Sequence, residues 1–127
     1  MPCSQLPNAA QIDLNADIGE GFDDSAIVPW LSSANISCGA HAGSEAEIRQ
    51  ALRLCKQYQV AAGAHPSYPD RANFGRQAIN MPLPELQVSL INQLDYFLRL
   101  AEQKLFLEQN ISGVQQVLEL AEQRLKQ

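Results

Sequence analysis

Residues 12–20 have the sequence Ile12-Asp13-Leu14-Asn15-Ala16-Asp17-Ile18-Gly19-Glu20. Apolar side chains alternate with Asp13, Asn15 and Asp17, and this period of two predicts a strand with one apolar and one polar face. Glu20 follows directly after the strand. Carboxylates side by side repel one another, so the cluster indicates a bound cation, shared protons or solvation. An exposed edge strand whose charges oppose aggregation is the alternative interpretation.

The composition limits the kind of protein to which this stretch belongs. A length of 127 residues with 46% apolar content fits one small globular domain over residues 1–127. The net charge of -5 and the lack of a basic stripe argue against a nucleic-acid partner or an anionic membrane. The sequence has no leader-like N-terminus, no membrane-length apolar run and no cysteine pairing pattern. We therefore expect a cytoplasmic protein with no nucleic-acid or membrane partner.

The rest of the chain alternates between predicted strands and helices. Strands are expected at residues 33–37 and 60–64, with a short helix from Asp23 and Asp24 through Leu31. Ser44 begins a helix, because Glu47 three residues later completes a capping box. A long amphipathic helix is expected over residues 83–102, then a short strand at 105–107 and a last helix capped by Ser112. This alternation predicts an α/β fold with a mainly parallel sheet and right-handed crossovers.

The apolar spacing of the two central helices predicts which side chains face the core. The first helix is expected to bury Ile48, Ala51, Leu52, Cys55 and Tyr58. The second is expected to bury Leu86, Leu90, Leu94, Phe97, Leu98 and Ala101.

The polar residues gather where strands end. Asp17 and Glu20 end the first strand, His41 follows the second, and His65 follows the third. Ligands of open α/β sheets bind at the carboxyl ends of the strands, so these side chains are expected to share one site. A lone histidine is more often structural than functional, but two at equivalent strand ends facing carboxylates favour a site.

The chemistry that such a set supports is hydrolysis. Aspartate and neutral histidine side chains together would suit a divalent ion such as Zn²⁺ or Mn²⁺, which lowers the pKa of a bound water. Without a metal, a carboxylate and a histidine can act as general base and acid. Cys38 offers a thiol nucleophile near a base, although a small buried thiol after a strand is common.

The connection over residues 66–82 is too long for a simple turn, and such loops in compact domains are usually functional. Arg71 and Arg76 flank Asn73-Phe74-Gly75 within it. An arginine there could hold a substrate carboxylate through two parallel hydrogen bonds. A surface arginine without a special role is the alternative.

Four blocks of sequence, in order, resemble the LamB/YcsF family, the A subunits of bacterial 5-oxoprolinase. The resemblance covers about residues 11–102. The blocks are Ile12-Asp13-Leu14-Asn15-Ala16-Asp17-Ile18-Gly19-Glu20, Ser33-Ala34-Asn35-Ile36-Ser37-Cys38-Gly39-Ala40-His41-Ala42-Gly43, Gly63-Ala64-His65-Pro66-Ser67-Tyr68-Pro69-Asp70 and Phe74-Gly75-Arg76.

The resemblance implies a partial (β/α) barrel of about four β/α units, related to glycoside hydrolase and deacetylase barrels. It also implies ATP-dependent opening of 5-oxo-L-proline to L-glutamate, together with partner B and C subunits. The implied catalytic residues are Asp13, Asn15, Asp17, Glu20, His41 and His65. The implied substrate-binding residues are Ser67 and Arg76, with Asp13, His41 and His65 as the candidate metal ligands.

The sequence departs from the family pattern over residues 103–127, where Lys104-Leu105-Phe106-Leu107 stands in place of a strand carrying a Lys-Pro-His-Gly motif. A full barrel of this type needs roughly 250 residues. We therefore expect half a barrel that is completed by a second copy or by a partner, opens into a small layered sheet, or is a poorly active remnant. Two alternatives remain open: a metal-dependent amide or N-acetyl hydrolase, and an inactive truncated binding protein.

Overall fold

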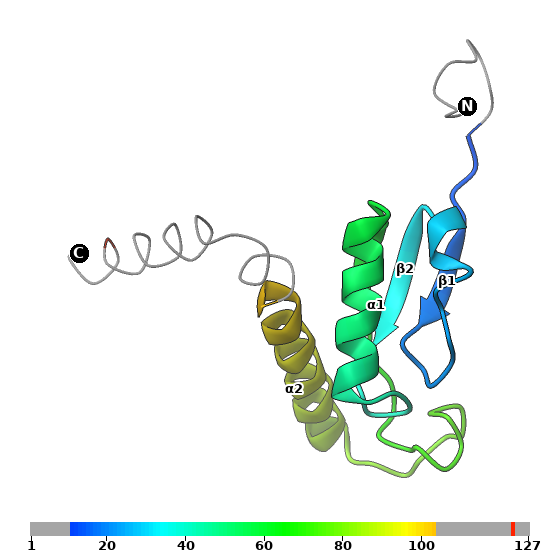
Figure 1. The fold of residues 1–127 in the computed structure, drawn as a ribbon. Helices are drawn as coiled ribbons and strands as arrows, with labels where there is room; N and C mark the ends of the chain where they lie inside the picture. Colours follow the sequence, from blue (N-terminus) through cyan, green and yellow to red (C-terminus); the bar gives the residue numbers. More distant parts are fainter. Residues whose placement is uncertain (1–10, 104–122, 124–127) are drawn as a thin grey trace.

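The computed structural model of the chain describes residues 11–103 and residue 123. Strands and helices alternate, as Figure 1 shows, and the predicted α/β class is confirmed. The elements in order are β1 (Asn15–Ile18), the 3-10 helix η2 (Val28–Trp30), β2 (Ser33–Ser37), α1 (Glu45–Gln57), β3 (Ala61–His65) and α2 (Leu83–Glu102).

The three strands form one parallel sheet in the order β1-β2-β3. Asp17 pairs in register with Asn35, and Asn35 with Gly63. One step further, Ile18 pairs with Ile36. The predicted parallel sheet is therefore confirmed for these strands, whereas the expected strand at 105–107 and the expected helix from Ser112 lie outside the described residues.

Helix α1 covers the apolar face of the sheet (Figure 1). Its start is the predicted capping box: the Ser44 backbone N–H donates to Glu47 Oε2 at 2.6 Å, and the Glu47 N–H donates to Ser44 Oγ at 3.3 Å. Ile48 and Leu52 on the helix are fully buried with Ile18 and Ile36 of the strands. Burying each such side chain stabilises the fold by about 1.5 to 3 kcal/mol, so this layer fixes the positions of the strand ends.

The predicted inward face of α1 is correct except at Tyr58. That residue is the C-cap of the helix and is 42% exposed, because the helix ends before its side chain can turn toward the sheet.

Helix α2 has its predicted bounds, but its buried stripe differs from the expected one. Leu94 and Leu98 are 39% and 57% exposed, while Gln93, Phe97 and Leu100 are buried. Gln93 explains why a different face of α2 points inward. Its Oε1 accepts from the Ser67 backbone N–H at 2.9 Å, and its Nε2 donates to the Ser67 carbonyl at 2.8 Å. A buried amide with both ends satisfied by backbone sets which face of the helix points inward.

The short helix expected from Asp23 through Leu31 is only the 3-10 turn Val28–Trp30. The two acids have other partners. Asp24 Oδ2 accepts from the Gly19 N–H at 2.9 Å, and Asp23 Oδ1 accepts from the Ser25 hydroxyl and N–H, which lowers the pKa of the exposed Asp23. Across the residues that the structure describes, no helix is long and apolar enough to cross a membrane.

Candidate functional site

Three strand ends bring three ligand-type side chains together. Glu20 lies just beyond β1, His41 lies in the loop after β2, and His65 is the last residue of β3. Parallel pairing places these ends at one edge of the sheet, with Ser37 and His65 in register. The predicted convergence of acids and histidines is therefore found, and we call Glu20, His41 and His65 the strand-end cluster.

Glu20 connects both histidines of the cluster. Its Oε1 lies 2.7 Å from His41 Nε2 and 3.3 Å from His65 Nδ1. The imidazole rings are 5.0 Å apart between centroids, at an interplanar angle of 58°. Asp17 Oδ1 lies 3.6 Å from His65 Nδ1, so a second carboxylate borders the cluster on its open side.

The cluster is enclosed to different degrees. His41 is 3% exposed, whereas the side chains of Glu20, His65 and Asp17 are 11%, 32% and 51% exposed. His41 Nδ1 is buried without a hydrogen-bond partner, and His65 Nδ1 contacts Glu20 without forming a hydrogen bond. Buried polar nitrogens without partners cost free energy, and such exceptions are often found at functional sites.

The donor set fits a divalent metal ion. One ligand atom each from Glu20, His41 and His65 lies within 4.8 Å of the others. Two histidines and a glutamate are one of the sets that hold catalytic zinc, which leaves a coordination position open for water or substrate. These residues could therefore hold a metal, while Asp13, the acid predicted for this role, lies elsewhere.

Asp13 and Asn15 belong to a hydrogen-bond network at the amino half of the same sheet face. Ser33 Oγ donates to both Asp13 carboxylate oxygens at 3.3 Å, and Asn15 Nδ2 donates to Ser33 Oγ at 2.9 Å. Asp13 precedes β1, so the strand runs between it and the histidines. Of the predicted metal set, the structure thus brings His41 and His65 together with Glu20, and places the Asp13 carboxylate on Ser33.

Asn35 is a residue that sequence reasoning missed. Its Nδ2 donates to Asn15 Oδ1 at 3.0 Å and to Asp17 Oδ1 at 3.2 Å. It therefore links the amino-end network to the carboxylate beside His65. The signal lay in the pairing register, because Asn35 is the partner of Asp17 across the sheet.

A cavity of about 160 Å³ opens onto the cluster. Asp17, the cluster itself, Ser67 and residues 74–76 line it. Phe74 contacts the His41 ring edge-on at 5.3 Å, and Arg76 lies 5.5 Å from the Phe74 ring. The predicted substrate-binding residues Ser67 and Arg76 therefore do line the cavity that contains the histidines.

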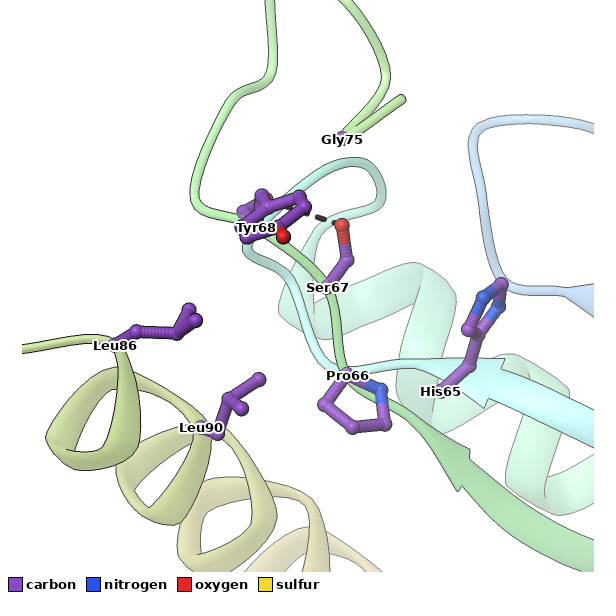
Figure 2. A pocket seen from close by; sticks show the side chains of 7 residues that line it. All are labelled: His65, Pro66, Ser67, Tyr68, Gly75, Leu86 and Leu90. Carbon is purple, nitrogen blue, oxygen red and sulfur yellow. Dashed lines mark hydrogen bonds between the residues drawn. The ribbon is translucent and has the colours of Figure 1, made fainter. Parts of the chain in front are cut away.

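A second, more open hollow of about 350 Å³ adjoins this cavity and shares His65, Ser67 and Gly75 with it. Figure 2 shows Leu86 and Leu90 of α2 on the opposite side, facing the Pro66 and Tyr68 segment. The dashed line marks the Ser67 hydroxyl donating to the Tyr68 carbonyl at 3.0 Å. The two hollows together offer a polar end at the histidines and an apolar end at α2.

At two glycines near the site, the backbone lies so close to neighbouring atoms that no side chain would fit. A Cβ on Gly75 would lie 1.9 Å from Ser67 Oγ and 2.8 Å from His41 Cβ, and its φ is +67°. A Cβ on Gly43 would lie 2.1 Å from the Gly19 carbonyl oxygen, with φ at +80°. Only glycine fits these positions without strain, so the loop around Gly75 packs against His41 and the loop around Gly43 packs against Gly19, just beyond β1.

Cys38 is next to this site but is a poor nucleophile. The residue is 4% exposed, and its Sγ lies 3.9 Å from the Ile36 carbonyl. Burial raises the pKa of the Cys38 thiol, which disfavours the thiolate that a nucleophile requires.

Comparisons with known proteins agree with this geometry. Residues 12–111 match the sequence model of the LamB/YcsF family. The 5-oxoprolinase A subunit of Haemophilus influenzae (strain PittEE) is 52% identical over 85 residues, which cover 66% of this chain and 35% of the relative. The lactam utilization protein from Thermus thermophilus, known from a crystal structure, matches with a TM-score of 0.61 and 41% identity, over 71% of this chain and 40% of that one.

The chain thus spans little more than a third of the length of the relatives it matches. The matched segment contains all three strands and the strand-end cluster. From the family match over most of its length, we conclude that this chain belongs to the LamB/YcsF family.

Proposed function

We propose that the chain is an A-type component of a 5-oxoprolinase, which hydrolyses 5-oxo-L-proline to L-glutamate together with B and C subunits. The observation that carries this proposal is the placement of Glu20 Oε1 between the two imidazoles, inside a cavity that also contains Arg76. The H. influenzae relative, which is named as the A subunit of 5-oxoprolinase, supports the same assignment.

The residues divide the work by their chemistry. Arg76 would hold the carboxylate of 5-oxoproline, because a guanidinium binds a carboxylate through two parallel hydrogen bonds. The pair of His41 and Glu20, whose Nε2 and Oε1 atoms lie 2.7 Å apart, would take a proton from the attacking water. His65 would return a proton to the ring nitrogen as the amide bond breaks. Asn35 would keep Asp17 beside His65.

ATP would make the resistant ring amide easier to hydrolyse. The cavity is lined by the carboxylates of Asp17 and Glu20 and by one cation, Arg76, and this set is a poor match for a triphosphate. We therefore assign nucleotide binding to the partner subunits or to sequence that the longer relatives possess. Because the chain spans little more than a third of its relatives, the three-stranded sheet would be the first part of a (β/α) barrel. The remainder would be supplied by a second copy or by a partner.

A second candidate is a metal-dependent hydrolase of amide or N-acetyl groups. The observation that favours it is the convergence of the Glu20, His41 and His65 ligand atoms within 4.8 Å. A divalent ion held there would supply a water of lowered pKa at the cavity. Asp17 at the border of the cluster would then accept the proton of that water.

The test is glutamate release from 5-oxoproline by the purified chain combined with B and C subunits, with and without ATP. We expect ATP-dependent release that falls by about a hundredfold or more in His41→Ala and His65→Ala, since general acid–base groups contribute roughly 10²- to 10⁴-fold. Asp95→Asn, on the exposed side of α2, is the matched control and should retain the wild-type rate.

Two results would contradict the proposal. If a full-length relative works with the same partners and this chain does not, the chain is an inactive binding protein. Release of acetate from N-acetyl substrates that needs a divalent ion, but neither ATP nor partners, would select the second candidate instead.

A further inference from the structure

The long connection after β3 contains a tight turn, residues 70–76, which we call the cover turn. Asp70 organises it: its carbonyl accepts from the Gly75 N–H at 2.7 Å, and its carboxylate accepts from the Asn73 N–H at 3.3 Å and from Asn73 Nδ2 at 2.8 Å. Phe74 adopts a φ of +58°, a conformation that bulky residues rarely take. The turn is therefore a built structure that keeps one strained residue in place.

The strained residue and its neighbour lie against His41. The Phe74 ring meets the His41 ring edge-on at 85°, and Gly75 is so close that a Cβ would overlap His41 Cβ. Because His41 is 3% exposed, a shift of this turn would change both the enclosure and the orientation of the imidazole.

Arg71 ties the cover turn to the loop that carries His41. Its Nη1 donates to the Gly39 carbonyl at 2.7 Å and its Nη2 donates to the Gly43 carbonyl at 3.1 Å. These two carbonyls lie two residues before and two residues after His41. A guanidinium can reach both at once because its N–H groups form a rigid fork, which the single ammonium of lysine lacks.

We propose that Arg71 is a positioning residue for His41: by bridging the Gly39 and Gly43 carbonyls it fixes the loop that presents the imidazole to Glu20. This inference rests on the proposed function only in assuming that the strand-end cluster is the working site. The two arginines of the turn then have separate roles, since Arg71 binds backbone and Arg76 faces the cavity.

The test uses the whole chain and the variants Arg71→Met and Arg71→Lys, with Arg99→Met as the matched control. Arg99 pairs with Asp95 on the exposed side of α2, at 2.8 Å. Two readouts are taken: amide hydrogen exchange at residues 39–43, and the affinity and visible absorption spectrum of added Co²⁺. A merely structural arginine would change exchange throughout the chain and leave the Co²⁺ spectrum unaltered.

We expect Arg71→Met to raise exchange at residues 39–43 by about tenfold while α1 amides keep their protection. The Co²⁺ affinity should fall by about tenfold, with an altered spectrum, as for residues that orient metal-binding histidines. Arg71→Lys should fall between Arg71→Met and the wild type, and it serves as the informative variant if Arg71→Met does not fold. Arg99→Met should match the wild type in both readouts.

The proposal is overturned if exchange at residues 39–43 in both Arg71 variants matches the wild type or rises only in parallel with α1. It is also overturned if the wild-type chain binds Co²⁺ and both variants keep the same Co²⁺ affinity and spectrum. If the wild-type chain does not bind Co²⁺, the metal-dependent candidate fails, while the exchange measurement still decides the role of Arg71.

Discussion

The two ends of the polar sheet face contain similar residues in different surroundings. At the amino end, the exposed Asp13 and Asn15 each form a hydrogen bond with the partly buried Ser33. At the carboxyl end, Glu20 and His41 are enclosed, and the His41 ring keeps one nitrogen without a partner. Burial and an imidazole nitrogen without a hydrogen-bond partner therefore distinguish the candidate site, whereas the residue types alone do not.

The largest expected effect separates the ligand sets of the two ends. Glu20→Gln and His41→Ala should weaken Co²⁺ binding by more than about a hundredfold, since even residues that only orient metal ligands contribute roughly 10- to 100-fold. Asp13→Asn should change the affinity less than about threefold, because its carboxylate bonds Ser33 instead. Isothermal titration with Co²⁺ measures both, and equal losses at Asp13 and Glu20 would erase the distinction between the ends.

The next effect compares a glycine packed against the cluster with a glycine in the middle of β3. Gly75→Ala should lower the free energy of unfolding by about 2 kcal/mol or more, because the new methyl would overlap Ser67 and His41 at a positive φ. Gly63→Ala should change it by less than about 1 kcal/mol, since its Cβ would lie 3.5 Å from Asn35 Oδ1, an ordinary contact. Urea denaturation gives both values, and a harmless Gly75→Ala would mean that the cover turn can move away from the cluster.

A smaller effect tests the link between the two ends. Asn35→Ala removes the donor shared by Asn15 and Asp17, and should cost about 1 kcal/mol of unfolding free energy, the usual net value of a hydrogen bond. Asn92→Ala, on α2, is the control and should be neutral in the same denaturation experiment. If Asn35→Ala and Asn92→Ala have the same free energy of unfolding, the network would be a surface feature without a role in holding Asp17.

The last effect appears only at alkaline pH and concerns the opposite, apolar face of the sheet, where it tests whether a buried thiol sets the pH response of stability. Burial raises the pKa of Cys55 to about 11 from an ordinary value of 9.0. The folded chain then holds a proton that the unfolded chain loses between these values, so stability should fall as the pH rises from 9 toward 11. Cys55→Ala should show a shallower fall in urea midpoints between about pH 8 and 10.5. An identical slope would assign the pH response to other groups.

The fold could be predicted where local signals were strong. The capping box at Ser44 and the unbroken amphipathic pattern of residues 83–102 indicated where both helices begin, and the alternation in residues 12–18 indicated the two faces of β1. The buried stripe of α2 could not be predicted, because Gln93 is polar and only the distant Ser67 backbone explains its burial.

The candidate site was predictable in part for a related reason. His41, His65 and Glu20 follow strands, and parallel pairing alone brings strand ends together. Sequence spacing could not tell that Ser33 binds the Asp13 carboxylate, nor that Arg71 reaches the Gly39 and Gly43 carbonyls, because both depend on contacts distant in sequence.

The register of the sheet also determines how far the side chains project from its polar face. Across one row, Asp17 and Asn35 have side chains of equal length and Gly63 has none, so the surface is lower over β3 than over β1 and β2. A molecule that arrives over β3 meets main chain first, and its far end then reaches the acids of β1. Entry from that side would bring a small molecule past His65, at the end of β3, before it reaches Glu20.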